Sequence, residues 1–157
     1  PCEVFESQEA LQQAYDLGEL EKDFIAVIRF QGPKANGMPE LHQLTPCLGA
    51  LLDQGFRVAL ITDGRMSGAS GKVPAAIHLC PEALDDGPIA RLRKGDVITM
   101  DMTHGTLTVH LSDDQLASRP YAQLSETDTL LSGSLGRDLF SVFRSNVGTA
   151  NRGASAF

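Results

Sequence analysis

The stretch RVALITDGRMSGASGK occupies residues 57–72 and is the most informative part of the sequence for the fold. Residues 57–61 are apolar and partly β-branched, which predicts a buried strand. Residues 62–72 are small or polar and include three glycines, which permit positive φ and a close approach of backbone to a ligand. A polar loop after a buried strand is either an anion-binding site or a glycine-rich surface turn. Composition favours the two interpretations equally.

This loop matches neither of two common catalytic motifs. A Walker P-loop needs G-x-x-x-x-G-K-[ST], but Gly64 and Gly71 are too far apart, and Val73 stands where Ser or Thr is required. The nucleophile elbow G-x-S-x-G is also absent, because Arg65 and Ala69 occupy the positions of its outer glycines. Composition and spacing therefore indicate an anion-friendly loop with a serine at its centre.

Patterns on the N-terminal side of this stretch predict alternating helices and strands. We expect a helix over residues 7–17, with Ser7 as its N-cap and Gly18 at its end. Residues 24–30 are apolar and partly β-branched, which predicts a strand. Residues 31–37 contain two glycines and one proline, which predicts a loop.

Two prolines frame the next predicted helix. Pro39 is expected to open a helix in its first turn, with Glu40 near the positive end of that helix. Pro46 lies where the helix should break or restart. Leucines then predict a second helical piece that ends at Gly55.

The C-terminal side contains the clearest local pattern of the chain. Residues 97–102 and 106–111 alternate between apolar and polar side chains and flank His104 and Gly105, which predicts a β-hairpin. The other elements predicted here are strands over 75–79 and 89–93, a capped helical turn over 112–117, an extended linker over 119–135, a helix over 137–143 and a frayed end over the last ten residues. Because several strands are adjacent in sequence, we predict a mixed α+β domain.

Composition limits the classes of function. With 157 residues the chain is long enough for one domain with a real core, and 42% hydrophobic with 21% charged residues is typical of soluble proteins. The sequence has neither a long apolar run nor a signal peptide, so we expect a cytoplasmic protein without a membrane partner. A net charge of −7 argues against nucleic acid, but a locally basic site can still bind an anionic metabolite.

Two long motifs resemble one enzyme family. The segments VIRFQGPKANGMPE at residues 27–40 and 59–83 are similar to the C-terminal domain of the dihydroxy-acid dehydratase and 6-phosphogluconate dehydratase family, which carries GPK…GMPE followed by TDGR-x-SG. The run SGASGKVPAAIH at 67–78 and the tail that begins GRDLF at 136–140 resemble the 6-phosphogluconate dehydratase branch. The resemblance implies a swivelling β/β/α domain, with a strand-rich, barrel-like core flanked by helices.

The resemblance also implies a larger assembly. The sequence begins with Pro-Cys-Glu rather than Met, so we expect residues 1–157 to be the single C-terminal domain of a longer dehydratase, partly extended from about residue 119. Family members carry an N-terminal domain that holds an iron–sulfur cluster, and they use Mg²⁺ or Mn²⁺. We expect the full-length protein to form a homodimer and the isolated domain to be inactive.

The three cysteines are not expected to bind that cluster. Cys2, Cys47 and Cys80 are widely spaced and form no C-x-x-C motif, a pattern typical of buried or incidental thiols in a cytosolic protein. The family's cluster ligands belong to the N-terminal domain.

The chemistry implied is the dehydration of 6-phosphogluconate to a 2-keto-3-deoxy acid, a step of the Entner–Doudoroff pathway. Family members remove the α-proton and expel the β-hydroxyl. Ser67 matches the family's base serine, acting as an alkoxide, although a turn serine that bonds its own backbone is the alternative. Glu40 matches the metal-binding carboxylate of GMPE, although a Glu at a helix start is favoured by the dipole alone.

Other residues of the two motifs are candidates for substrate binding. We expect the substrate's carboxylate or phosphate to be contacted by Arg65, Ser70 and Lys72. Lys72 is the stronger candidate for the phosphate. A solvated lysine is an equal alternative for Lys72. His78 is expected to be a buried structural residue of the 75–79 strand.

Two different functions remain open at this point. The first is the C-terminal catalytic half of a dehydratase, which acts on 6-phosphogluconate or on another sugar acid or dihydroxy acid. The second is an anion-binding or regulatory domain without catalysis.

Overall fold

The computed structural model describes residues 1–66, 71–124 and 138–157. Its centre is a four-stranded parallel sheet in the order β1 (Cys2–Phe5), β2 (Phe24–Ile28), β3 (Val58–Thr62) and β4 (Ala75–Ala76). Ala26 pairs with Leu60 in the register of β2 and β3. The predicted strand over residues 57–61 is therefore confirmed as a central strand, buried on both faces as parallel sheets require.

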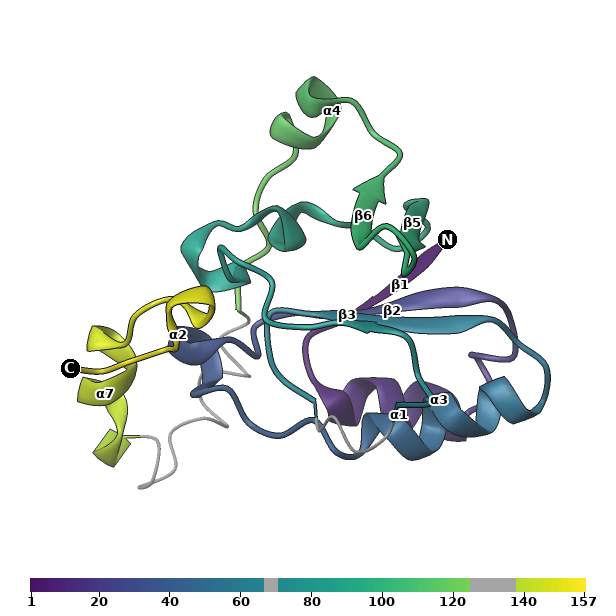
Figure 1. Ribbon diagram of the computed structural model, residues 1–157, viewed down its shortest axis with the longest axis horizontal. Coiled ribbons are helices and arrows are strands. Elements are labelled where there is room, and N and C mark those ends of the chain that lie inside the picture. The colour runs from purple at the N-terminus through teal and green to yellow at the C-terminus, as the bar shows by residue number, and fades with distance from the viewer. Residues whose placement is uncertain (67–70, 125–137) are drawn as a thin grey trace.

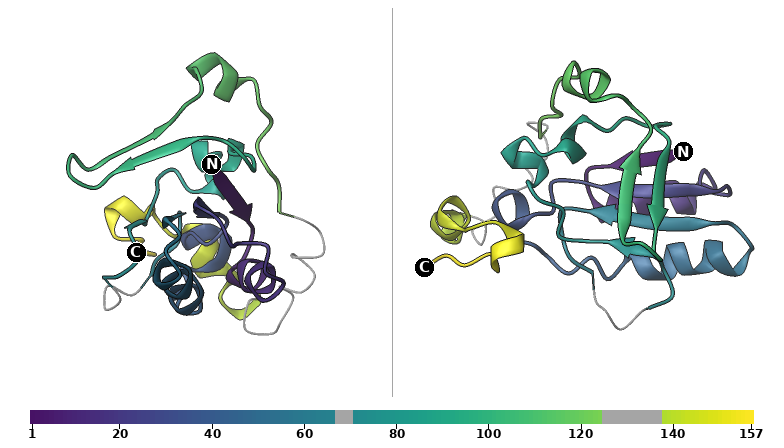
Figure 2. Two further views of the ribbon diagram at one scale, coloured as in Figure 1. Left: turned by 90° about the vertical axis from the view of Figure 1, so that its right-hand side faces the viewer. Right: turned by 45° about the horizontal axis from the view of Figure 1, so that its top comes forward.

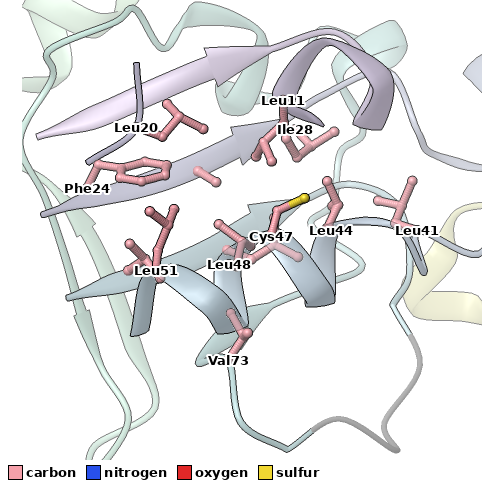
Figure 3. Packing of buried hydrophobic residues seen from close by; sticks show 13 residues of the cluster. Leu11, Leu20, Phe24, Ile28, Leu41, Leu44, Cys47, Leu48, Leu51 and Val73 are labelled. Carbon is pink, nitrogen blue, oxygen red and sulfur yellow. The ribbon is translucent and has the colours of Figure 1, made fainter. Parts of the chain in front are cut away.

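Two helices cover one face of this sheet (Figure 1). Helix α1 (Gln8–Asp16) connects β1 to β2, and helix α3 (Leu44–Asp53) lies between β2 and β3. The Ser7 hydroxyl accepts a hydrogen bond from the Ala10 N–H, which confirms the predicted N-cap. The larger core cluster fills the space between these helices and the sheet (Figure 3), with side chains such as Leu11, Leu48 and Leu60 fully buried.

The other face of the sheet carries the predicted hairpin (Figure 2). Strands β5 (Ile98–Asp101) and β6 (Thr106–Val109) pair antiparallel as a separate two-stranded sheet. Two 3-10 helices, η2 (Ala83–Asp85) and η3 (Pro88–Arg91), and helix α4 (Asp113–Ala117) accompany it. Side chains from β2, β3, η3 and β5, including Val27, Ile61, Ile89 and Ile98, form a second core cluster. The domain is a mixture of helices and strands, as predicted.

Several predicted elements around Pro39 are wrong. Residues 31–37 contain a short helix, α2 (Pro33–Asn36), rather than only a loop. No helix begins at Pro39; Glu40 instead forms a bridge with Arg65. Helix α3 starts at Leu44 and runs through Pro46 without a break. Pro46 is tolerated because it lies in the first helical turn, where the backbone N–H has no intrahelical partner.

Two predicted strands and the predicted chain end also need correction. The strand over 75–79 is reduced to β4, and residues 89–93 begin as η3 instead of a strand. The predicted helix over 137–143 appears as α7 (Ser141–Asn146), and the last residues include the 3-10 helix η4 (Ala150–Arg152) instead of a frayed end. The predicted linker is irregular over 119–124, and its remainder lies outside the described residues. None of the helices described here combines the length and apolar character that a bilayer-crossing segment needs.

Candidate functional site

The candidate site lies where β2 and β3 end. Because the two strands run parallel, their carboxyl ends meet at one edge of the sheet, which is the usual place for a ligand in such folds. The loops after β2, after β3 and after β4 all reach this edge. The geometry of the edge therefore depends on what holds these three loops together.

Asp63, the first residue after β3, holds the loops through its buried carboxylate. Its side chain accepts backbone hydrogen bonds from Phe30 at 3.1 Å, Gln31 at 2.9 Å and Ala83 at 2.8 Å. Asp63 is completely buried. Burial raises the pKa of the Asp63 carboxyl, while the three N–H donors oppose that shift. With every observed partner a donor, Asp63 acts as a fixed acceptor that joins three loops.

A second buried carboxylate, Glu82, performs a similar task at α2. Its oxygens accept hydrogen bonds from the N–H groups of Lys34 at 3.1 Å and Ala35 at 2.8 Å, which are orphan donors of the first helical turn. The side chain fits against Gly32, since a Cβ at that position would lie 2.6 Å from Glu82 Cδ. Burial and the charges of Asp63 and Asp85 raise the pKa of the Glu82 carboxyl, and the two N–H donors lower it. Glu82 thus fixes the helix that precedes the GMPE segment.

The two motifs of the sequence meet at Glu40 and Arg65. These residues form a parallel β-bridge, and the Leu41 N–H donates to the Arg65 carbonyl at 3.2 Å. The Arg65 guanidinium donates to Glu40 Oε2 at 3.1 Å and to the Met38 carbonyl at 2.8 Å. The Arg65 side chain is 49% exposed and that of Glu40 31%. The edge therefore presents a cation and a carboxylate that a polar ligand can reach.

Backbone conformation at this edge is unusual. Phe30, Met38 and His78 have φ angles of 61°, 57° and 60°, in the left-handed region that non-glycine residues rarely adopt. Such conformations persist where surrounding contacts over-determine them, and they concentrate at functional sites. Here the Phe30 N–H is bound by Asp63, and the His78 N–H donates to the Gly64 carbonyl at 2.9 Å.

His78 does not have the surroundings predicted for it. The prediction placed it inside a buried strand, but β4 ends at Ala76 and the His78 side chain is exposed. His78 adopts a left-handed φ of 60°, which interrupts the regular strand. The chain still lies beside the end of β3, since the Leu79 N–H donates to the Thr62 carbonyl at 3.2 Å.

Lys72 lies apart from the Glu40–Arg65 pair. Its ammonium group contacts both Asp53 carboxylate oxygens at 2.6 Å, at the end of α3. The Lys72 side chain passes over Gly49, where a Cβ would be 3.7 Å from Lys72 Cδ. Lys72 precedes β4 and Arg65 follows β3, so the two residues leave opposite ends of a parallel strand pair. The described residues do not bring these two predicted substrate ligands together.

The predicted base Ser67 and the predicted ligand Ser70 lie outside the described residues, so their roles stay predictions. Within the described ranges, no group of three or more His, Cys, Asp or Glu side chains is placed to hold a metal ion. Glu40 can offer one carboxylate. The described part of the chain therefore does not complete a divalent-cation site by itself.

The cysteines are also separate from this edge. Cys2 and Cys47 are buried on different elements, in different core clusters, and Cys80 is partly exposed. Burial is the main cause that raises the pKa of the Cys2 and Cys47 thiols. A buried thiol with a raised pKa behaves as a small apolar side chain.

The sequence analysis missed both buried carboxylates. Asp63 lies in the polar loop predicted over residues 62–72, and Glu82 lies beyond the strand predicted over 75–79, but the patterns indicated no role for either carboxylate. The available signal for Asp63 was its position directly after a buried strand, where an acidic residue needs several donors. Glu82 had no local signal, because its partners lie almost fifty positions earlier in the chain.

Comparisons with known proteins match a region of this chain that includes both motifs. The C-terminal family described as "Dihydroxy-acid/6-phosphogluconate dehydratase C-terminal" matches residues 1–154. A phosphogluconate dehydratase from Rhizobium meliloti is 52% identical over 155 residues, which cover 99% of this chain and 25% of that protein. The phosphogluconate dehydratase of Pseudomonas aeruginosa is 52% identical over 157 residues, which cover 100% of this chain and 25% of the relative.

A more distant relative broadens the family. The dihydroxy-acid dehydratase of Acetivibrio thermocellus is 36% identical over 156 residues, covering 98% of this chain and 27% of its own length. The chain thus spans about a quarter of the length of the curated relatives that it matches. From the family match and these identities, the chain belongs to the dihydroxy-acid/6-phosphogluconate dehydratase family, as its C-terminal domain.

Proposed function

We propose that this chain is the C-terminal catalytic half of a hydro-lyase that converts 6-phospho-D-gluconate to 2-dehydro-3-deoxy-6-phospho-D-gluconate and water, in the Entner–Doudoroff pathway. The observation that carries the proposal is the contact between Glu40 and Arg65, which joins the GMPE and TDGR segments at one edge of the sheet. Relatives named phosphogluconate dehydratase are more similar to this chain than the dihydroxy-acid relative, 52% against 36% identical. This difference favours the phosphorylated substrate.

The reaction removes one proton and one hydroxide. A base takes the C2 proton, and the electron pair of that C–H bond forms the C2–C3 double bond while the C3 hydroxyl leaves with the electrons of its C–O bond. The expelled hydroxide takes a proton and becomes water. The enol then gains a proton at C3 and loses the proton of its C2 hydroxyl, which gives the 2-keto acid, so that no oxidant or reductant is needed.

The chain's residues would divide this work as follows. Ser67, five positions after the last residue of β3 in the sequence, would take the C2 proton, since a base must lie within hydrogen-bonding reach of that proton. The Arg65 guanidinium, held by the Met38 carbonyl, would bind the substrate carboxylate in a bidentate manner. Ser70 and Lys72 would bind the phosphate, for which Lys72 must leave Asp53.

The cofactors are proposed to depend on the rest of the polypeptide. Glu40 would supply one oxygen ligand to Mg²⁺ or Mn²⁺, and a hard cation needs several more oxygen ligands than the described part of the chain gathers. The iron–sulfur cluster would be held by an N-terminal domain. The cation and the cluster would act as Lewis acids toward the substrate.

The same proposal covers the wider organisation. Residues 1–157 would be one domain of a cytoplasmic homodimeric enzyme, and would swivel against the N-terminal domain. The described residues form two separate sheets, one of four strands and one of two, rather than a closed barrel. The strand-rich, barrel-like core is therefore kept as part of this proposal.

Ser67→Ala in the full-length enzyme tests the proposal. Removing a positioned base should lower kcat by roughly 10²–10⁴, with substrate still bound and metal content unchanged. Exchange of the C2 proton with solvent should stop, because that step needs only the base. Ser70→Ala is the matched control, and it should raise KM rather than lower kcat. Exchange at the wild-type rate in Ser67→Ala would show that Ser67 is a turn residue.

The isolated chain gives a second test. Residues 1–157 alone should form no 2-keto acid from 6-phosphogluconate, since most metal and cluster ligands would be missing. Turnover by this chain alone contradicts the division of labour proposed here. Absence of turnover by the full-length protein on both a phosphorylated sugar acid and a dihydroxy acid would favour the non-catalytic, anion-binding alternative.

A further inference from the structure

Five large apolar side chains stand exposed near the C-terminal end of the chain. They are Leu139, Phe140, Val142, Phe143 and Phe157, with exposed fractions of 69%, 55%, 66%, 48% and 106%. The Phe143 ring lies beside both Phe140 and Phe157, with ring centroids 6.0 and 6.5 Å apart. We call this group the tail patch. Soluble proteins rarely leave a contiguous apolar patch exposed, and such a patch commonly marks a site of interaction with another surface.

Helix α7, which carries part of the tail patch, cannot be stable by itself. It spans only Ser141–Asn146 and buries none of its residues. Isolated helices shorter than about 12–15 residues are marginal in water, because nucleation costs more than a few hydrogen bonds return. Its main neighbour within the described residues is α2, a helix of four residues. A further surface is therefore needed to hold α7 in place.

The position of the tail patch connects it to the candidate site. Figures 1 and 2 show α7 beside α2, at the end of the molecule toward which β2 and β3 point. Helix α2 lies directly before the GMPE segment, and Glu82 fixes its N-terminal turn. A body that covers α7 would thus also lie next to the edge that holds Glu40 and Arg65. This is the same edge at which the described residues leave a cation site incomplete.

We propose that the tail patch is the docking surface for the part of the same polypeptide that precedes Pro1, an inference that rests on the proposed function. The matched relatives have about three quarters of their length outside the region that this chain covers, and the family match is to a C-terminal domain. A corresponding region of this polypeptide would cover the tail patch. Docking there would bring the missing ligands to the Glu40 edge.

The size of the tail patch also favours an interdomain contact over a dimer contact. Five such side chains, half to fully exposed, offer on the order of 500 Å² of apolar surface. A standard stable interface between separate proteins buries about 800 Å² per partner. Interdomain contacts within one chain are smaller, starting at about 600 Å². The tail patch therefore fits a tethered partner better than a second copy.

Photo-crosslinking in the full-length protein tests this assignment. Benzoylphenylalanine replaces Phe143 in one preparation and Leu17 in another. Leu17 is 65% exposed and follows α1, at the opposite edge of the sheet. Each preparation mixes ¹⁵N-labelled and unlabelled subunits before irradiation. We expect position 143 to crosslink to residues that precede Pro1, in peptide pairs of one isotope only, and position 17 to give no such product.

Other outcomes would overturn the proposal. Mixed-isotope pairs at position 143 would show that a second copy covers the tail patch. Crosslinks confined to residues 1–157, or equal capture at both positions, would show that the tail patch has no such occupant. Phe140→Ser combined with Phe143→Ser should abolish crosslinks from a benzoylphenylalanine at position 139. Because crosslinking is read without any assay of turnover, failure of the docking proposal is distinguishable from failure of the dehydratase proposal.

Discussion

Glu40 and Arg65 are joined by both backbone and side chain, although 25 positions separate them. Their backbones form a parallel bridge, and the Arg65 guanidinium donates to Glu40 Oε2 at 3.1 Å. Because both side chains are partly exposed, this ion pair contributes only roughly 0–1 kcal/mol to stability. Its significance is geometric, since it places a carboxylate and a guanidinium from two motifs at one edge.

Glu40→Gln in the full-length enzyme tests the metal-ligand role. Replacing a charged oxygen ligand by an amide should weaken Mn²⁺ binding and lower activity, while the free energy of unfolding changes by less than about 1 kcal/mol. Titration with Mn²⁺, followed by its paramagnetic signal, measures the affinity. Arg65→Gln is the matched control, because it removes the same ion pair and keeps the carboxylate. Equal Mn²⁺ affinity in wild type and Glu40→Gln would exclude Glu40 as a ligand.

Lys72→Met separates phosphate binding from the ion pair with Asp53. If Lys72 binds the substrate phosphate, the variant should raise KM for 6-phosphogluconate and leave KM for the unphosphorylated sugar acid unchanged. Asp53→Asn, the control, breaks the same ion pair and should leave both KM values near wild type. Both exposed side chains contribute little to stability. Identical steady-state constants in wild type and Lys72→Met would leave the lysine with only its structural pairing.

Two glycine-to-alanine substitutions should change the free energy of unfolding in opposite directions. Gly32→Ala should destabilise the chain by about 1–3 kcal/mol, because its Cβ would lie 2.6 Å from Glu82 Cδ and displace the carboxylate that caps α2. Gly49→Ala should stabilise it by up to about 1 kcal/mol, because Gly49 is inside α3 and its Cβ would make an ordinary contact with Lys72. Denaturant unfolding of both variants checks the prediction. A stable Gly32→Ala variant would contradict the role given to Glu82.

The ion pair between Asp96 and Arg119 should make stability depend on pH. Arg119 donates to Asp96 with both terminal nitrogens, at 2.5 and 2.9 Å, and this pairing is the main cause that lowers the pKa of the Asp96 carboxyl. A lowered folded-state pKa adds stability that is complete well above the unfolded value of about 3.9. This stability is lost as the pH falls through the folded-state pKa.

Asp96→Asn provides the measurement. The difference in unfolding free energy between wild type and Asp96→Asn should be largest near pH 7 and should shrink below about pH 4, because the other carboxyls titrate equally in both proteins. Arg119→Lys should lose part of the effect, since an ammonium cannot reproduce the two-pronged contact. A difference that stays constant from pH 7 to pH 3 would show that the ion pair is not responsible.

Local chemistry made several elements predictable. The hairpin of β5 and β6 follows from alternation on both sides of a Gly-containing turn. The cap at Ser7 and the capping box at Ser112 follow from short-range hydrogen bonds between neighbours in the chain. These features were confirmed because the groups that decide them lie within a few residues of one another.

The predictions drawn from Pro46 and Ile89 are wrong because burial decided the outcome at both positions. Pro46 suggested a broken helix, yet the buried face of α3, with Leu44, Leu48 and Leu51, keeps one continuous helix. Ile89 suggested a strand, yet Pro88 opens η3 and Ile89 packs in the second core cluster as part of it. An apolar residue indicates burial, but it does not specify which element carries it.

The sequence by itself determined the strand at 57–61, the polar loop that follows it, and the two motifs that indicate the dehydratase family. Only the tertiary structure decided that Glu40 meets Arg65, that Lys72 pairs with Asp53, and that Asp63 holds three loops together. Each of these contacts joins segments about twenty or more positions apart. Their geometry depends on the order and direction of strands in the sheet, which side-chain periodicity along one segment does not encode.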